Sequence, residues 1–318
     1  RLYDETIAGL SFRIEEDNVS LDEALEKLSS PDRKVRVLAG MNISSELQKK
    51  VDLFALITNN LIKDKEIEDR WRKYPEVDTF RHLSNNIEPR VVESLVKSVK
   101  ETFPLTSHRY YKLKAKRLAL KNLEFWDRNA PFGNIDEKIW TWEEAAYLVL
   151  SAFKEFSPEL ATIGSRFFEN QWIDALPRTG KSSGAFAHPT VPSVHPYLLL
   201  NFQGKTNDVM TLAHELGHGI HQILASSQGM LISETPLIMA ETASVFGEQL
   251  TFRKLLKSAK GKAAKQSLLA SKIEDMLNTI IRQISFYEFE RLLHHERRSG
   301  EISQERIGEL WMSVQAES

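Results

Sequence analysis

Apolar residues recur at helical spacing along most of this chain, and this periodicity constrains its fold more than any other feature. Two polar pairs, Ser20 with Glu23 and Thr141 with Glu144, have the spacing of capping boxes that begin helices. The sequence therefore predicts a mainly α-helical protein. The clearest apolar repeats lie in Val51–Ile62, Val91–Phe103, Ala145–Phe156, Val209–Leu224, Leu237–Leu256 and Leu268–Leu293.

One region departs from the helical pattern. Residues 172–205 are rich in Gly, Pro and Ser, and they contain short β-prone runs at Trp172–Leu176 and Tyr197–Phe202. Prolines in this region disfavour a helix because proline lacks the backbone N–H that a helix interior needs. We expect a small β-sheet here. Pro196 at the start of its last strand favours a position at the sheet edge.

The segment RNAPFGNIDEK at residues 128–138 is the best internal break. It divides the chain into a helical front part, residues 1–130, and a second part, residues 131–318, which carries the candidate chemistry. The chain starts without Met, partway through a helical pattern, and it stops on an amphipathic helix with no capping glycine. We therefore expect a fragment of a longer protein.

Composition argues against several classes of partner. The chain has 42 basic and 44 acidic residues and a net charge of −2, so it has no electrostatic footprint for nucleic acid. No apolar run approaches the ~18 residues of a membrane-spanning helix, and we expect no membrane partner. The start has no signal-peptide pattern, which favours a cytoplasmic location. The absence of cysteine excludes thiolate ligands and fits a reducing compartment. The oligomeric state is not indicated.

The segment MTLAHELGHGIHQIL, residues 210–224, places two histidines four residues apart on an expected helix. Positions i and i+4 share one helix face, so His214 and His218 can both point at one metal ion. Glu215 lies beside them and is placed to take a proton from a metal-bound water. The alternative interpretation is two helical histidines with ordinary hydrogen-bond partners near a glutamate.

A catalytic zinc site needs a third protein ligand. Glu241, Ser244 and Glu248 follow the spacing 0, +3 and +7, so they form one polar stripe on an otherwise apolar helix. A polar stripe is costly in a core unless it meets partners or an ion. Glu241 is the best third ligand, and Ser244 or Glu248 is placed to orient a ligand histidine. The alternative is a solvated helix face.

Three further residues have two interpretations each. His221 lies three residues after His218, and it either supports the metal site or is a core histidine. His195 and Tyr197 lie in the loop and strand before the histidine helix. Each either contacts a substrate or completes a turn.

The chain resembles the oligoendopeptidase F family, which is related to thimet oligopeptidase. The resemblance is dense over about residues 177–250, and it rests on the segments GKSSGAFAHPTVPSVHPYLLLNFQGKTNDVMTLAHELGHGIH and ETPLIMAETASVFGE. It implies a mainly helical, two-lobed zincin-type metallopeptidase with a small sheet beside the zinc helix. Such an enzyme cuts short, unfolded peptides inside a deep channel. Residues 1–130 would then belong to the N-terminal lobe and the channel wall.

The resemblance also implies roles for single residues. His214, His218 and Glu241 match the family's zinc ligands, and Glu215 matches its general base. The strand at about residues 195–202 would lie along the cleft, where an edge strand could pair with an extended substrate. Family members carry a later segment with a histidine and tyrosines that contact the substrate. This chain ends before any such stretch, so we expect the family's C-terminal end to be missing.

These observations together predict a zinc-dependent endopeptidase that binds one zinc ion and hydrolyses short oligopeptides. The alternative is a metal-stabilised helical module, or an inactive fragment, that binds peptides without cleaving them. A weaker third interpretation is a helical interaction scaffold without a metal.

Overall fold

A computed structural model describes residues 1–14, 17–131, 138–178, 181 and 184–318. The chain forms two compact units, which are described separately. Unit 1 comprises residues 1–134 and 269–318, and unit 2 comprises residues 135–268. The break expected at residues 128–138 falls largely on residues 132–137, which lie outside the described part of the chain.

The C-terminal residues differ from the expected division because they group with the front part of the chain. Leu293, Ile302 and Leu310 are buried in one apolar cluster with Ile62, which lies far away in sequence. In addition, the Asn59 side chain accepts a hydrogen bond from the Ile302 backbone at 2.9 Å. Burial of these apolar side chains therefore draws residues 269–318 to unit 1.

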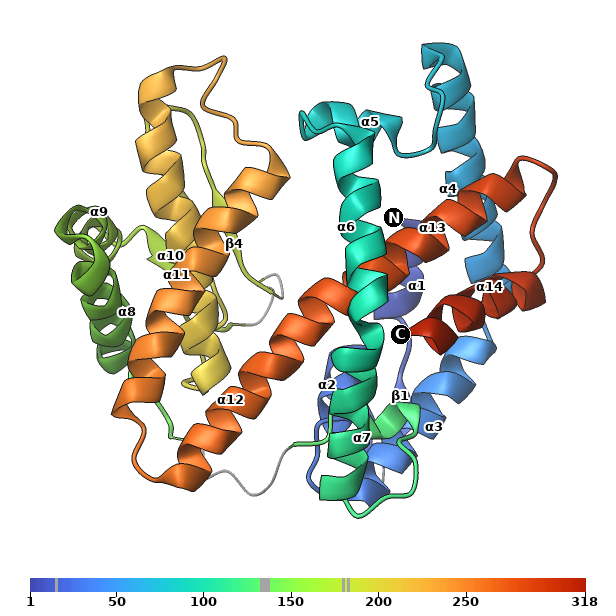
Figure 1. Ribbon diagram of the computed structural model, residues 1–318, viewed down its shortest axis with the longest axis horizontal. Coiled ribbons are helices and arrows are strands. Elements are labelled where there is room, and N and C mark those ends of the chain that lie inside the picture. The colour runs from blue at the N-terminus through green and yellow to red at the C-terminus, as the bar shows by residue number, and fades with distance from the viewer. Residues whose placement is uncertain (15–16, 132–137, 179–180, 182–183) are drawn as a thin grey trace. The chain divides into compact units, whose positions relative to one another are not determined.

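Helices dominate both units, which confirms the predicted mainly α-helical fold (Figure 1). The elements of unit 1 are α1 (Leu2–Ala8), β1 (Phe12–Ile14), β2 (Asp17–Val19), α2 (Leu21–Lys27), α3 (Arg33–Gln48), α4 (Val51–Arg72), α5 (Thr79–Ser84), α6 (Pro89–Thr102), η1 (Phe103–Leu105), α7 (Ser107–Arg117), η2 (Phe125–Asp127), the π-helical η4 (Asn278–Arg282), α13 (Gln283–Arg297) and α14 (Gln304–Glu317).

Unit 2 begins with a helical hairpin and ends on two long helices. Its elements are α8 (Trp142–Phe156), α9 (Pro158–Glu169), β3 (Ile173–Asp174), β4 (Phe186–His188), β5 (Tyr197–Leu199), α10 (Thr206–Ala225), η3 (Ser226–Gln228) and α11 (Leu237–Ser258), and α12 (Lys262–Leu277) crosses from this unit into unit 1.

Several of these helices begin at the capping residues that the sequence predicted. Ser20 accepts a hydrogen bond from the Glu23 backbone, and Glu23 accepts one from the Ser20 backbone at 2.8 Å, so a capping box starts α2. Thr141 and Glu144 form the same reciprocal pair at the start of α8. Both predicted capping boxes are confirmed. No described helix is both long enough and apolar enough to cross a lipid bilayer.

The sheet of unit 2 has the order β3–β5–β4, with β3 parallel and β4 antiparallel to β5. The prediction that this strand lies at the sheet edge is therefore wrong, because β5 is the central strand. Leu198 donates its backbone N–H to Trp172 at 2.9 Å, and β4 covers the other side of β5. Pro196 lies just outside β5, so its missing N–H removes no hydrogen bond between the strands.

The apolar core of unit 2 forms where α8, α9, α10 and the sheet meet. Fully buried members include Phe153 of α8, Phe167 of α9, Leu198 of β5, and Leu212 and Leu216 of α10. The apolar face of α10 is therefore held firmly. Its histidines lie on the side that faces α11.

Candidate metal centre

Two glycines allow α10 and α11 to approach closely (Figure 1). A Cβ atom on Gly217 would lie 2.9 Å from the backbone oxygen of Ala243. A Cβ atom on Gly247 would lie 2.8 Å from the backbone oxygen of Ala213. Glycine is therefore required at both positions, since any larger residue would push the helices apart. The close packing brings the polar stripe of α11 to the histidine face of α10.

Three potential ligands converge at this crossing. The Nε2 atoms of His214 and His218 lie 3.1 Å apart. Glu241 places one carboxylate oxygen 3.4 Å from His214 Nε2 and the other 3.7 Å from His218 Nε2. One ligand atom from each residue lies within 4.8 Å of the others, and no other such group occurs among the described residues.

The surrounding hydrogen bonds orient these side chains. His214 Nδ1 lies 2.7 Å from Glu248 Oε1, and the Ala240 backbone hydrogen-bonds to His218. The Ser244 hydroxyl, which is fully buried, donates to a Glu241 carboxylate oxygen at 3.0 Å. Such partners hold metal-binding side chains in place in known sites.

These hydrogen bonds test whether the residues suit a metal. We assign the Nδ1–H tautomer to His214 from its contact with Glu248. The lone pair of His214 Nε2 then faces both His218 Nε2 and the Glu241 carboxylate. The two imidazole nitrogens and the carboxylate can therefore all present lone pairs to one cation placed among them. Two imidazoles and one carboxylate are a ligand set for catalytic zinc, so the residues fit this ion.

The two histidines differ in charge preference. Burial lowers the pKa of His214, but the hydrogen bond to Glu248 and the charges of nearby glutamates outweigh burial, so its pKa is raised. For His218, burial and the neighbouring His214 lower the pKa below its usual value. His218 therefore favours the neutral form, which binds a metal.

Glu215 lies on the same turn of α10 as His214 but is more deeply buried. Glu215 is 6% exposed, and its buried Oε2 atom has no hydrogen-bond partner in the part of the chain that the structure describes. Burial raises the pKa of Glu215 to about 7, against the opposing effect of His214. A carboxyl group whose pKa lies near neutrality is suited to accept and release a proton.

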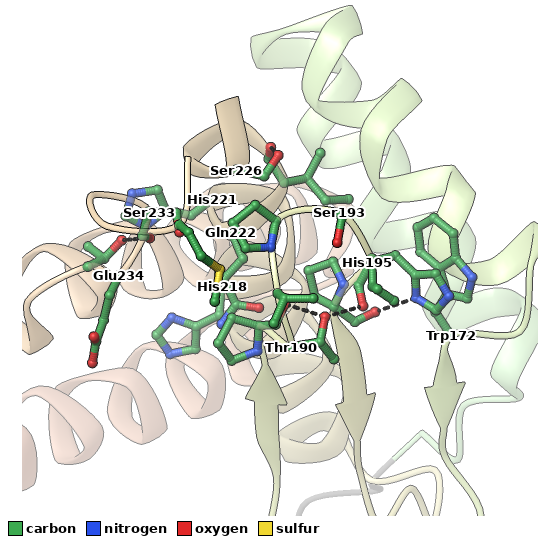
Figure 2. Close-up of a pocket in the computed structure, with 18 of the residues that line it drawn as sticks. Trp172, Thr190, Ser193, His195, His218, His221, Gln222, Ser226, Ser233 and Glu234 are labelled. Atoms are coloured by element: carbon green, nitrogen blue, oxygen red, sulfur yellow. Dashed lines mark hydrogen bonds between the residues drawn. The ribbon is translucent and has the colours of Figure 1, made fainter. Parts of the chain in front are cut away.

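A cavity of about 910 Å³ adjoins the candidate metal centre and is lined by His218, His221 and His195 (Figure 2). His221 is half-buried at its wall. His195 stacks on Trp172 with ring centroids 3.9 Å apart, and its Nδ1 lies 3.0 Å from the Pro196 carbonyl oxygen. The structure thus places His195 both in a turn and at the cavity.

Tyr197 follows in β5, where it is 49% exposed and lies opposite His188 of β4. Its ring centroid lies 4.5 Å from that of His195. The cavity is also lined by Trp172, Arg166 and Gln222, none of which was predicted to be functional. The only available signal was the position of Trp172 in a β-prone run.

Comparison with known proteins adds independent information. The model of peptidase family M3 matches residues 151–318, more than half of the chain. Oligoendopeptidase F, chromosomal, of Lactococcus lactis subsp. cremoris is 27% identical over 276 residues, which cover 86% of this chain and 45% of that protein. Oligopeptidase PepF of Bacillus subtilis (strain 168) is 28% identical over 275 residues, which cover 86% of this chain and 41% of that protein.

A solved structure shows the same fold. The oligoendopeptidase-F of Enterococcus faecium superposes with a TM-score of 0.69 at 23% identity, and the match covers 98% of this chain and 50% of that one. The chain spans less than half the length of the two curated relatives. The matched family model, the relatives and the ligand cluster of α10 and α11 agree, and the chain belongs to peptidase family M3.

Proposed function

We propose that this chain carries the zinc site of an endopeptidase that hydrolyses short, unfolded peptides. The observation that carries the proposal is the convergence of His214, His218 and Glu241 beside the buried carboxyl group of Glu215. The names of the relatives, oligoendopeptidase F and oligopeptidase, support the same activity.

His214, His218 and Glu241 would hold one zinc ion. A bound zinc ion supplies a Lewis acid for the scissile carbonyl and lowers the pKa of a bound water to about 7. The contacts of Glu248 and Ser244 would keep His214 and Glu241 aimed at the ion.

Glu215 would move the protons of the reaction. Its carboxylate accepts a proton from the attacking water and then gives that proton to the amine that leaves when the peptide bond breaks. Because its Oε2 atom has no hydrogen-bond partner among the described residues, Glu215 can accept a hydrogen bond from the attacking water. Its dry surroundings keep the pKa near neutrality, where both transfers are favourable.

The test is cleavage of a quenched fluorescent peptide by the zinc-loaded chain and by its Glu215→Gln variant. General-base catalysis contributes about 10²–10⁴-fold, so we expect a loss of turnover of at least that size with unchanged zinc content. Glu159→Gln, which changes an exposed glutamate of α9, is the matched control and should retain parental turnover.

Two results would contradict the proposal. Cleavage by Glu215→Gln at the parental rate would exclude Glu215 as the base. A parent chain that binds zinc and peptide but shows no turnover would favour the alternative of a metal-stabilised peptide-binding module.

A further inference from the structure

The cavity beside His218 is large enough for several residues of a peptide. Its volume of about 910 Å³ lies within the range of about 300–1,000 Å³ that is typical of sites for small ligands. The loop from Pro189 to Pro196 forms one wall, and the segment from Met230 to Thr235 contributes to another. A peptide with its scissile bond at the candidate metal centre would therefore extend one of its ends into this cavity.

The loop wall is held in one conformation by its own contacts. Thr190 has a left-handed backbone with a φ of 58°, and its N–H donates to His188 Nδ1 at 3.0 Å. The Thr190 hydroxyl donates to the His195 carbonyl at 2.9 Å. Proline at positions 189, 192 and 196 restricts the backbone further. The cavity is therefore formed before any ligand binds.

Three side chains meet at one end of the cavity. The Trp172 ring stacks on His195, at 3.9 Å from centroid to centroid, and the Arg166 guanidinium carbon lies over the Trp172 ring at 5.4 Å from its centroid. Phe167 also meets the edge of Trp172 with ring centroids 5.3 Å apart. Contact with an aromatic face restrains a guanidinium while leaving its N–H donors available.

The guanidinium of Arg166 is not neutralised by a direct ion pair with a described residue. Among the described residues that line the cavity, Glu234 is the only acidic one. In Figure 2, Glu234 and Trp172 lie on opposite sides of the view, with His218 between them. The end of the cavity at Trp172 therefore carries a positive charge whose N–H donors form no ion pair with a described residue.

We propose that Arg166, held on Trp172, binds a carboxylate of the peptide that occupies this cavity. The carboxylate is either the free C-terminus of the peptide or an acidic side chain near it. A guanidinium suits this role because its parallel N–H donors match the two oxygens of a carboxylate. This inference rests on the proposed function, because it takes the occupant to be the peptide substrate.

The test measures binding and does not depend on cleavage. The zinc-loaded Glu215→Gln chain is titrated against fluorescein-labelled peptides of about eight residues, long enough to cross the cavity at about 3.3 Å per residue. One pair differs only in a C-terminal acid or carboxamide, and a second pair, both amidated, differs only in Glu or Gln near that end. Fluorescence anisotropy gives each Kd.

We expect tighter binding of the acidic member of at least one pair, by up to about fivefold, the size expected for a partly solvated charge pair. Adding Arg166→Gln should abolish this preference, and higher salt should weaken it. Arg253→Gln, which changes an exposed arginine of α11 that does not line the cavity, should preserve it.

The two pairs distinguish the sources of the carboxylate. A preference in the first pair assigns Arg166 to the peptide C-terminus, and a preference in the second assigns it to an acidic side chain. Equal binding in both pairs, or a preference that survives Arg166→Gln, overturns the inference. Because binding is measured with the Glu215→Gln chain, a parent chain that fails to cleave peptides would contradict the proposed function and leave this result standing.

Discussion

Unit 1 and unit 2 each bring ionisable side chains together between packed elements, but the two clusters differ in burial and in how well their acceptor atoms are satisfied. In unit 1, the Asp127 carboxylate is fully buried and contacts two arginines. Arg36 donates to Oδ1 at 3.0 Å, and Arg33 donates to Oδ2 at 3.0 Å. The Glu124 backbone N–H also donates to Oδ2 at 3.3 Å. Every oxygen of this carboxylate therefore has donors.

The cluster of unit 2 has fewer donors for its acceptors. Ser244 donates to Glu241, but His214 Nε2 faces another imidazole nitrogen and a carboxylate, and Glu215 Oε2 has no partner among the described residues. Burying unsatisfied polar groups costs about 1–3 kcal/mol each. A cluster whose carboxylate is saturated with donors, such as that of Asp127, stabilises a fold, whereas one with unsaturated acceptors is suited to receive a ligand. The following predictions test this difference.

The largest effect should come from breaking the saturated cluster. Asp127→Asn leaves Arg36 buried without a counter-charge, so we expect the free energy of unfolding to fall by about 3–5 kcal/mol. Zinc content should not change, because the variant lies in the other unit. Urea denaturation followed by circular dichroism measures the loss. Asp64→Asn, at an exposed position of α4, is the control and should change stability by less than about 0.5 kcal/mol.

A ligand should stabilise the unsaturated cluster. At free zinc of about 100 times Kd, binding should add about 2.7 kcal/mol to the stability of the parent chain. Thermal unfolding with and without zinc measures this gain as a rise in Tm. His218→Ala should abolish the rise, and Asp127→Asn should keep it. A parent Tm that is the same with and without zinc would remove the distinction between the two clusters.

A smaller effect should follow from changing a residue that orients a ligand. Glu248→Gln weakens the hydrogen bond to His214 Nδ1, so zinc affinity should fall by about 10–100-fold. Competition with a chromophoric chelator measures the Kd. Glu159→Gln should leave it unchanged. Equal affinity in parent and Glu248→Gln would show that Glu248 serves α10–α11 packing alone.

The smallest effect concerns pH. Burial raises the pKa of Asp127, but its hydrogen bonds to Arg33 and Arg36 outweigh burial and lower the pKa below its usual value. The stability gained from a lowered pKa is present above the unfolded value of about 3.9 and is lost as pH falls through the folded value. Below about pH 4, the parent should therefore lose stability more steeply than Asp127→Asn. Parallel slopes in urea denaturation at several pH values would contradict this.

The helical character of the chain could be predicted because its causes are local. The capping box of Ser20 and Glu23 involves residues three apart, and helix geometry alone puts His214 and His218 on one face. The polar stripe of Glu241, Ser244 and Glu248 was visible for the same reason. The contact of this stripe with the histidines was also predicted, but the spacing of residues within one helix could not test it.

Other features depend on contacts between distant parts of the chain. The position of β5 in the centre of its sheet depends on β3 and β4, which the local pattern of residues 197–199 does not reveal. The association of Leu293 and Ile302 with Ile62 likewise depends on apolar burial across more than two hundred residues of sequence. Long-range pairings of this kind are weakly encoded in any one segment.

Which side chains of α10 share a face follows from the order of its residues, because the backbone geometry of a helix requires only neighbouring residues. Tertiary structure alone decided that this face meets Glu241 and Glu248, since the meeting requires Gly217 and Gly247 to bring two helices together. The packing of the chain also buries Glu215 and places Arg166 over Trp172. Burial and charge environment are properties of the packed chain, and they arise only when separate segments exclude water from one another.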